Sequence, residues 1–223
     1  MELTATKETI TNKSAIKIKK RDGRLEDLDI DKIHFVVEEA CEGLAGVSSS
    51  QIEINANIQF YDGMTTKEVQ QILVRSANDL ISLEAPNYQY AAARLLSYDV
   101  RKEAHGQYEY MPLLKLILRN IKAGVYDRNI VEKYNKSEIK RLNTWIKRDR
   151  DLDFTYAGLR QVVDKYLVQD RSSGDLFETP QDMYMMIAAT LFADYPAKTR
   201  MNYVKKYYDA ISTFKINIPT PVM

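Results

Sequence analysis

The patterned part of the chain begins with an alternation of apolar and charged residues. Residues Ile16 to Lys19 alternate isoleucine with lysine, which is the pattern of a half-buried strand. Arg21-Asp22-Gly23 follows, and a three-residue loop with glycine in the left-handed conformation is a common closure of a hairpin. We therefore predict a β-hairpin over residues 15–28. Its register pairs Ile18 with Glu26 and Lys20 with Arg24, so that Ile18, Lys20 and Glu26 share one face.

Four helical patterns follow the hairpin. Apolar residues recur every three or four positions after Asp31, which we expect to cap a helix from Lys32 to about Glu42. Thr65 or Thr66 begins the third helix, and Glu68 is placed for a capping box if Thr65 is the cap. The second and fourth helices are expected over residues 50–58 and 86–104. A hairpin with four helices makes a unit of ordinary small-domain size.

The rest of the chain is also helical in pattern. Helices are predicted over residues 112–124, 127–134, 137–147, 155–168, 179–192 and from 196 onward, the fifth of them opened by a capping box from Thr179 to Asp182. Residues Phe214 to Pro219 alternate like a strand. This strand is either a frayed tail, or a partner of the loop at 168–178, or part of a sheet that another sequence supplies.

The amino-acid composition excludes some classes of partner but does not indicate a function. Hydrophobic residues make up 45% of the 223 residues and charged residues 28%, with a formal net charge of +1. That balance is ordinary for a globular protein, and it provides no overall field toward nucleic acid or an anionic membrane. The apolar runs are too short for a membrane span of about 20 residues. We therefore predict neither a nucleic-acid nor a membrane partner.

Few residues offer catalytic or metal chemistry. Cys41 is the only cysteine, which fits a reducing cytoplasm, and we expect a buried, inert thiol. His34 and His105 lie far apart, so no metal site is predicted. No phosphate-binding glycine loop and no Ser-His-Asp arrangement is present, so no catalytic residue is predicted. Asp149 and Asp151 lie in a charge-dense stretch that we interpret as a solvated helix end.

One basic cluster could bind a phosphate, and two helix-face pairs are each ordinary when taken singly. Lys19-Lys20-Arg21 forms a basic cluster at the hairpin tip, although a solvated strand end is the commoner explanation of such a cluster. Thr66 and Gln70 share one face of the third predicted helix because they are four residues apart. Tyr98 and Lys102 do the same on the fourth, where a core tyrosine beside a surface-reaching lysine is the ordinary interpretation.

Taken in order along the chain, the motifs resemble a known family. Lys20-Arg21-Asp22-Gly23, Asp31-Lys32-Ile33 and the stretch from Tyr61 to Thr66 resemble an ATP-cone. Residues 85–95 resemble the last helix of the cone in class I ribonucleotide reductase large subunits. The likeness continues through later segments and is closest to the bacterial and phage diphosphate-type enzymes. These segments are residues 105–109, 148–151, 154–156, 165–168, 212–214 and 219–223.

The resemblance implies a mainly α fold in four parts. Residues 1–15 would be a flexible tail, and residues 16–105 a four-helix ATP-cone capped by the β-hairpin. Residues 106–213 would form the helical N-terminal part of the large-subunit domain. Residues 214–223 would supply a terminal strand that starts the missing α/β barrel.

The resemblance also implies a nucleotide site. The cone would bind ATP as activator and dATP as inhibitor, with Mg²⁺, while Lys20 and Lys102 hold phosphates and Ile18 and Ile33 flank the base or sugar. Gln70 stands where relatives in this subgroup often have histidine; glutamine donates a hydrogen bond but cannot become cationic. The implied nucleotide-binding residues are Ile18, Lys20, Arg21, Glu26, Asp27, Leu28, Asp29, Ile30, Asp31, Lys32, Ile33, Thr66, Gln70, Tyr98 and Lys102. Thr220 matches a threonine that contacts the substrate diphosphate.

The radical chemistry of the family needs cysteines that this sequence does not contain, because Cys41 lies in the cone. We therefore expect the chain to work only with the remaining C-terminal part of the large subunit, or with a second chain that carries it. The implied partners also include the small radical-generating subunit and further copies of the assembled large subunit, in the cytoplasm. One alternative is a stand-alone nucleotide sensor that acts by binding a partner, and a less favoured one is a helical interaction module without a ligand.

Overall fold

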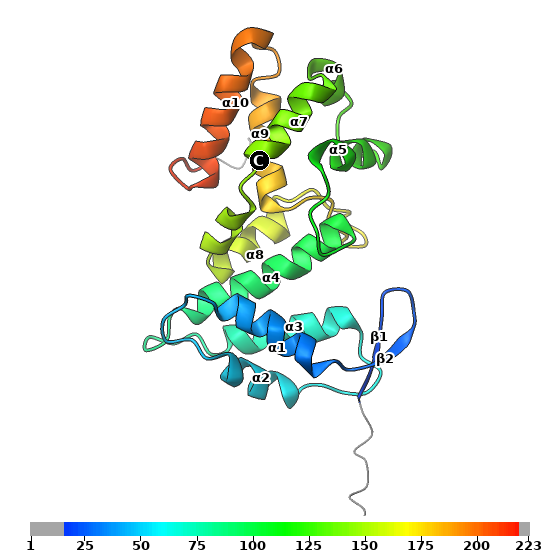
Figure 1. The fold of residues 1–223 in the computed structure, drawn as a ribbon, viewed down its shortest axis with the longest axis vertical. Helices are drawn as coiled ribbons and strands as arrows, with labels where there is room; N and C mark the ends of the chain where they lie inside the picture. The colour runs from blue at the N-terminus through cyan, green and yellow to red at the C-terminus, as the bar shows by residue number, and fades with distance from the viewer. Residues whose placement is uncertain (1–15, 219–223) are drawn as a thin grey trace, which may run out of the picture.

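The computed structural model describes residues 16–218, which are mainly helical (Figure 1). The expected tail at 1–15, residues 219–223 of the expected barrel start and Thr220 therefore lie outside the described residues. Within the described range one two-stranded sheet is present, at the start of the chain. None of the described helices is long and apolar enough to cross a bilayer.

The predicted hairpin and its register are confirmed. β1 (Lys17–Lys19) pairs antiparallel with β2 (Leu25–Asp27), and Ile18 lies opposite Glu26. The N–H of Lys20 donates to the carbonyl of Arg24 at 2.8 Å, which closes the loop. Gly23 has a φ of +88°, the left-handed conformation that this turn requires.

Four helices follow the hairpin: α1 (Ile30–Cys41), α2 (Ser49–Asn57), α3 (Thr66–Asn78) and α4 (Tyr88–His105). The predicted cap of α1 is wrong. Asp29, not Asp31, has the extended backbone of an N-cap, and its side chain accepts the N–H of Lys32, so the helix begins at Ile30. Of the two starts that the sequence left open for α3, Thr65 is the cap, and it forms the capping box with Glu68 that this alternative predicts.

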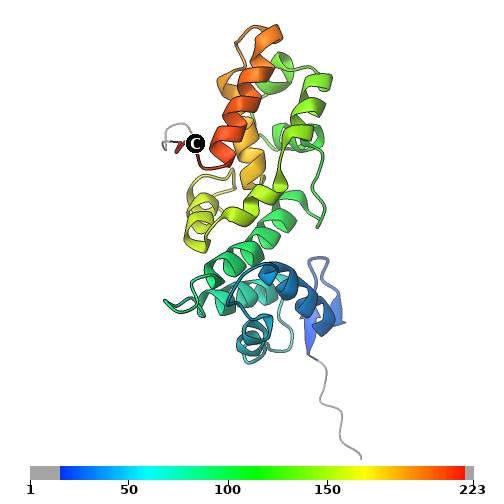
Figure 2. The same ribbon diagram turned by 60° about the vertical axis from the view of Figure 1, so that its left-hand side comes forward.

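α4 is the helix that joins the two halves of the molecule. It packs against α1 and α3 on one side and against α8 (Tyr156–Lys165) and the 3₁₀ helix η1 (Arg148–Asp153) on the other. Figures 1 and 2 both show it between the hairpin-bearing part and the remaining helices. Alanines 91, 92 and 93 are fully buried, and such small side chains let neighbouring helices approach α4 closely.

The second half is built from further helices around α9. These are α5 (Leu113–Lys122), α6 (Asn129–Lys133), α7 (Lys136–Trp145), α9 (Pro180–Leu191) and α10 (Ala197–Ser212), in addition to η1 and α8. The predicted capping box at the start of α9 is present, with Pro180 in the first helical position. α9 packs against α10 and η1, and its first turn is buried.

The charge-dense stretch around Asp151 is not a solvated helix end. It forms η1, and the carboxyl group of Asp151 is buried, with Oδ1 accepting a hydrogen bond from Gln181 at 2.9 Å. The earlier interpretation is wrong for this residue because α9 covers it, and local sequence does not reveal that contact. Asp149 remains exposed.

The terminal strand is also absent from the described residues 214–218. Phe214 has a φ of +56°, and the N–H of Lys215 donates to the carbonyl of Ala210 at 2.9 Å, so the chain turns instead of extending. The ring of Phe214 packs edge-on against Phe154, with ring centres 5.0 Å apart. The loop at 168–178 makes its own bridge between Gln169 and Leu176.

Candidate functional site

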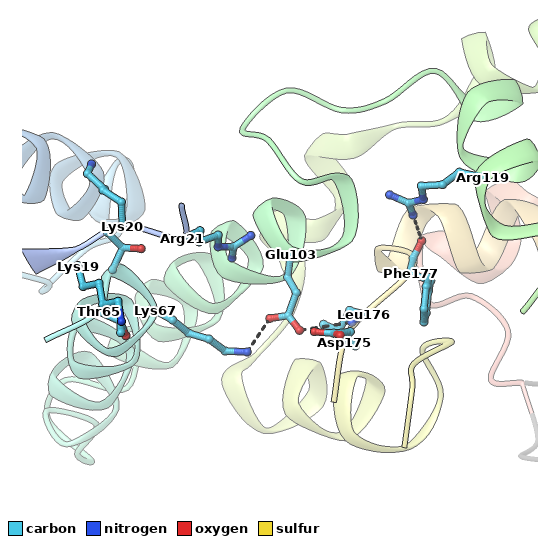
Figure 3. Close-up of a pocket in the computed structure, with 11 residues that line it drawn as sticks. Lys19, Lys20, Arg21, Thr65, Lys67, Glu103, Arg119, Asp175, Leu176 and Phe177 are labelled. Carbon is cyan, nitrogen blue, oxygen red and sulfur yellow. Dashed lines mark hydrogen bonds and ion pairs between the residues drawn. The ribbon is translucent and has the colours of Figure 1, made fainter. Parts of the chain in front are cut away.

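The hairpin tip, the start of α3 and the end of α4 meet around two cavities. The larger, of about 660 Å³, lies between Lys19–Arg21, the first turn of α3 and residues 175–177. Figure 3 shows Lys20, Arg21 and Lys67 on one side of it and the segment from Asp175 to Phe177 on the other. Glu103 lies between them and is ion-paired with Lys67 at 3.1 Å. The smaller, of about 100 Å³, is lined by Arg21, Val36, Thr66, Lys67, Gln70, Tyr98, Asp99, Lys102 and Tyr108. The two cavities share Arg21, Thr66 and Lys67.

Positive charge accumulates where the two cavities join. Arg21 reaches across to α4 and donates from Nη1 to the backbone carbonyl of Lys102 at 3.1 Å. Partial burial of its ammonium group lowers the pKa of Lys102, and the neighbouring charges of Arg21 and Lys20 lower it further, with Asp99 opposing them. Among residues 16–218, neither Arg21 nor Lys102 forms an ion pair with a carboxylate. An anion placed here would relieve the repulsion.

Lys20 differs from Arg21 and Lys102 because it has a carboxylate partner. Its ammonium group lies 3.1 Å from a carboxylate oxygen of Glu26, the residue beside it on the same hairpin face. Both side chains are partly exposed, so the pair costs little to break. A phosphate could therefore compete with Glu26 for Lys20.

Helix α3 contributes its first turn and one amide to the smaller cavity. Thr66 is the first residue of the helix and lies directly after the capping residue Thr65. Gln70 follows one turn later, and its Nε2 donates to the backbone carbonyl of Leu95 on α4 at 2.8 Å. Gln70 thus ties α3 to α4 at the cavity wall. Tyr98 also lines this wall, and it is only half-buried.

The structure brings together six of the residues that the sequence singled out: Lys20, Arg21, Thr66, Gln70, Tyr98 and Lys102. It leaves the others outside the lining of both cavities, namely Ile18, Glu26, Asp27, Leu28, Asp29, Ile30, Asp31, Lys32 and Ile33. Ile18 and Ile33 are buried in the core, and Lys32 pairs with Asp29 at 2.8 Å. Their contact with a nucleotide stays a prediction.

Sequence reasoning missed several lining residues. Asp99 precedes Lys102 by three positions on α4, so helical spacing could have placed it on the same side. Lys67 follows Thr66 directly. Tyr108 gave no signal, because it lies beyond the end of α4 and reaches the cavity only through the path of the connector.

The remaining reactive side chains lie elsewhere. Cys41 is partly buried in α1, and burial raises the pKa of its thiol to about 11, as an unreactive thiol requires. His34 is exposed and lies between the carboxylates of Glu38 and Glu53. Within the described part of the chain, no group of three histidine, cysteine or acidic residues is arranged to hold a metal ion.

Comparison with known proteins assigns both parts of the chain to described families. Residues 16–103 match the family model of the ATP cone domain, and residues 152–223 match that of the ribonucleotide reductase all-alpha domain. The chain is 47% identical over 206 residues to ribonucleoside-diphosphate reductase 1 subunit alpha of Escherichia coli strain K12, covering 92% of this chain. It corresponds to the N-terminal ATP cone and all-alpha region of the class I ribonucleotide reductase alpha subunit.

Other relatives of the alpha subunit agree. Identity is 40% over 210 residues to the ribonucleoside-diphosphate reductase subunit alpha of Enterobacteria phage T4 and 34% over 208 residues to that of Helicobacter pylori, each covering 93% of this chain. The chain spans only 26–27% of the length of these alpha subunits. Both cavities lie at the edge of the ATP cone, where its hairpin, α3 and α4 come together.

Proposed function

We propose that this chain binds ATP as an activating effector and dATP as an inhibitory one, and thereby controls the reduction of ribonucleoside diphosphates. The observation that carries the proposal is the group of Lys20, Arg21 and Lys102, of which two have no carboxylate partner among the described residues, at the mouth of cavities in an ATP cone. Triphosphate is the polyanion that such a group fits.

The phosphates would lie among these three cations and the first turn of α3. Arg21 offers a planar fork of N–H groups, whereas Lys20 and Lys102 offer mobile point charges. The start of α3 adds backbone N–H groups and the hydroxyl of Thr66, which suit an anion. Mg²⁺ would enter with the phosphates, since the described residues form no metal cage of their own.

The base and sugar would lie deeper, toward Tyr98 and Gln70. Ile18 and Ile33 would flank them, and the segment from Glu26 to Lys32 would wrap the nucleotide from the hairpin side. These residues line neither cavity in the free chain, so this part of the proposal requires the hairpin to shift against α1. Because Lys32 is paired only with the exposed Asp29, its release would cost little.

ATP and dATP can exert opposite effects only if they favour different states. An effector that bound both states equally would shift nothing. The two nucleotides differ in one ribose hydroxyl. Gln70 is the residue in the lining of the smaller cavity that has an amide side chain. Its Nε2 is already bound to Leu95, which leaves its carbonyl oxygen as the group that could accept a hydrogen bond from that hydroxyl.

The reduction itself would depend on residues outside this sequence. Cys41 is the only cysteine, and it lies on α1 of the cone. We propose that the remaining part of the large subunit supplies the radical chemistry and that a small radical-generating subunit and further large subunits complete the assembly in the cytoplasm. Thr220 would contact the substrate diphosphate there. The end of α4 at His105, where Gly106 is left-handed, supports a cone boundary at 105.

Calorimetric titration of the chain with Mg-ATP and with Mg-dATP tests the binding. Lys102→Ala should weaken both by about 10- to 100-fold, the loss expected for a hydrogen bond between two charged groups. Lys122→Ala is the matched control, because Lys122 is an exposed lysine that lines neither cavity. The absence of saturable heat in the wild type, or equal affinity of both variants, would contradict the proposal.

The regulatory part needs a separate test. The chain should be co-expressed with a fragment that carries the rest of a reductase large subunit, and the small subunit should be added. We expect ribonucleotide reduction that ATP raises and dATP lowers. Nucleotide binding without association of the two pieces would instead favour the stand-alone sensor.

A further inference from the structure

The guanidinium group of Arg101 lies among three tyrosine rings beside the smaller cavity. Its central carbon is 3.9 Å from the ring centre of Tyr108, 5.1 Å from that of Tyr110 and 5.2 Å from that of Tyr98. Tyr98 and Tyr108 line the cavity, whereas Arg101 and Tyr110 do not, and Arg101 contacts both of the lining tyrosines. The electron-rich ring faces attract the cation and hold it in place.

Arg101 contacts these three rings and forms no ion pair with a carboxylate among the described residues. Its Nε and Nη2 atoms are buried and have no hydrogen-bond partner among the described residues. A buried N–H group without a partner is costly, and the attraction between the cation and the three ring faces offsets part of that cost. Any movement of Tyr98 or Tyr108 therefore changes the packing of Arg101 directly.

The same stack continues into the second half of the molecule. Tyr110 contacts a second guanidinium, that of Arg148, with the central carbon 4.3 Å from its ring centre. Arg148 donates to the buried carboxylate of Asp182 at 2.6 Å and to the hydroxyl of Thr179 at 2.9 Å. Asp182 and Thr179 form the capping box of α9, so the stack ends on the first turn of that helix.

A nucleotide that enters the smaller cavity meets this stack at Tyr98 and Tyr108, which line its wall. A volume of about 100 Å³ is well below the roughly 300 Å³ at which ligand pockets begin, so the base and sugar fit only if wall residues move. Tyr108 is the wall residue that bridges two elements, because its hydroxyl donates to Glu39 on α1 at 2.9 Å while its ring covers Arg101. A shift of Tyr108 must break one contact or carry Arg101 with it.

We propose that Arg101 positions the two tyrosine walls of the nucleotide cavity and that the stack of Tyr108, Arg101, Tyr110 and Arg148 carries nucleotide occupancy to the first turn of α9. This inference rests on the proposed nucleotide binding. It assigns the coupling to side-chain contacts at the end of α4, in addition to the helix backbone. Physical contact alone does not demonstrate coupling, so the test measures the response at the far end.

Hydrogen–deuterium exchange of the whole chain, with and without saturating Mg-ATP, measures that response. Peptides that cover residues 178–185 should change their exchange rate by at least about threefold when ATP binds to the wild type. Tyr110→Leu should retain ATP affinity within about twofold, because Tyr110 does not line the cavity and, unlike Arg101, makes no ring contact with Tyr98 or Tyr108 among the described residues. It should nevertheless lose the exchange response in these peptides. Tyr110→Phe keeps the ring and should restore it.

Two further variants complete the design. Tyr203→Leu is the matched control, since Tyr203 stacks on Phe192 away from this path, and it should keep the response. Arg101→Lys keeps the charge but loses the planar group, and should both weaken ATP binding several-fold and abolish the response. It also replaces Tyr110→Leu as the test if circular dichroism shows that Tyr110→Leu has lost helix.

The outcomes separate the two proposals. ATP binding without any response at 178–185 in the wild type, or a response that survives both Tyr110→Leu and Arg101→Lys, would overturn the coupling and leave nucleotide binding intact. A wild-type chain that binds no ATP would overturn the proposed function, and the coupling with it.

Discussion

At Lys102, burial and two neighbouring cations act on one ammonium group. All three influences lower its pKa in the free chain, and only Asp99 opposes them. A bound triphosphate would favour the charged form and raise the pKa again. The proton balance of the site therefore reports directly on whether phosphates lie beside Lys102.

This balance gives a prediction with a definite sign. At a pH near the free-state pKa of Lys102, ATP binding should take up protons, and affinity should fall as the pH rises through that value. Calorimetry over a series of alkaline pH values, each in two buffers of different ionisation heat, measures the uptake. Lys102→Arg, which stays charged, should bind ATP without this uptake. Equal uptake in Lys102→Arg would place the proton on another group.

The burial of Asp151 could not be predicted from its neighbours in the sequence. Burial raises the pKa of this carboxyl to about 7, and its Oδ2 atom is buried without a hydrogen-bond partner among the described residues. Its neighbours in sequence are charged, and they suggested solvent exposure. The cover comes from α9, about 30 residues away along the chain, and no local pattern encodes that contact.

At the scale of elements, the start of α3 carries both a cap and part of the site. The hydroxyl of Thr65 accepts the N–H of Glu68 at 3.2 Å, and a carboxylate oxygen of Glu68 accepts the N–H of Thr65 at 2.7 Å. This reciprocal pair fixes where α3 begins, and so where Thr66 enters the cavity.

Thr65→Ala should lower the free energy of unfolding by about 1 kcal/mol, the usual cost of removing a threonine N-cap. Urea denaturation followed by circular dichroism measures it. Thr144→Ala is the control, because the hydroxyl of Thr144 bonds only to the carbonyl of Arg141 in its own helix. A loss no larger than that of the control would mean that the box does not stabilise α3.

Elements set by local chemistry could be predicted from the sequence, and those set by distant contacts could not. The hairpin register and the caps at Thr65 and Thr179 were correct, because turn and capping residues act over three or four positions. The strand after Phe214 was wrong within the described residues, because its backbone turns and its ring packs on Phe154. The alternation of apolar residues gives no information about the contact between Phe214 and Phe154.

At the scale of the whole molecule, helix α4 packs against both the cone and the second half. It provides Tyr98 and Lys102 to the smaller cavity, and it packs against α8 and η1 beyond. The site could be predicted in part, since the resemblance supplied Lys20 and Lys102. The contribution of Tyr108 could not be predicted, because it follows from the path of the chain after α4.

Shared packing on α4 predicts that nucleotide stabilises both halves together. Trp145, the only tryptophan, lies on α7 and lines neither cavity, so its fluorescence reports the second half. ATP at about 100 times its Kd should raise the free energy of unfolding by about 2.7 kcal/mol, seen equally by Trp145 fluorescence and by circular dichroism. If the free energy of unfolding measured by Trp145 fluorescence does not change with ATP, the two halves unfold independently.

The central claim is that triphosphate lies between Lys20 and Lys102, and lysine NMR tests it most directly. Reductive methylation with carbon-13 gives each lysine a signal while keeping its charge, and Lys→Arg variants assign the signals. We expect Mg-ATP to shift the signals of Lys20 and Lys102 with one saturation curve and to raise the pKa of Lys102, while the signals of Lys115 and Lys122 stay unchanged. ATP binding that leaves Lys20 and Lys102 unshifted would contradict it.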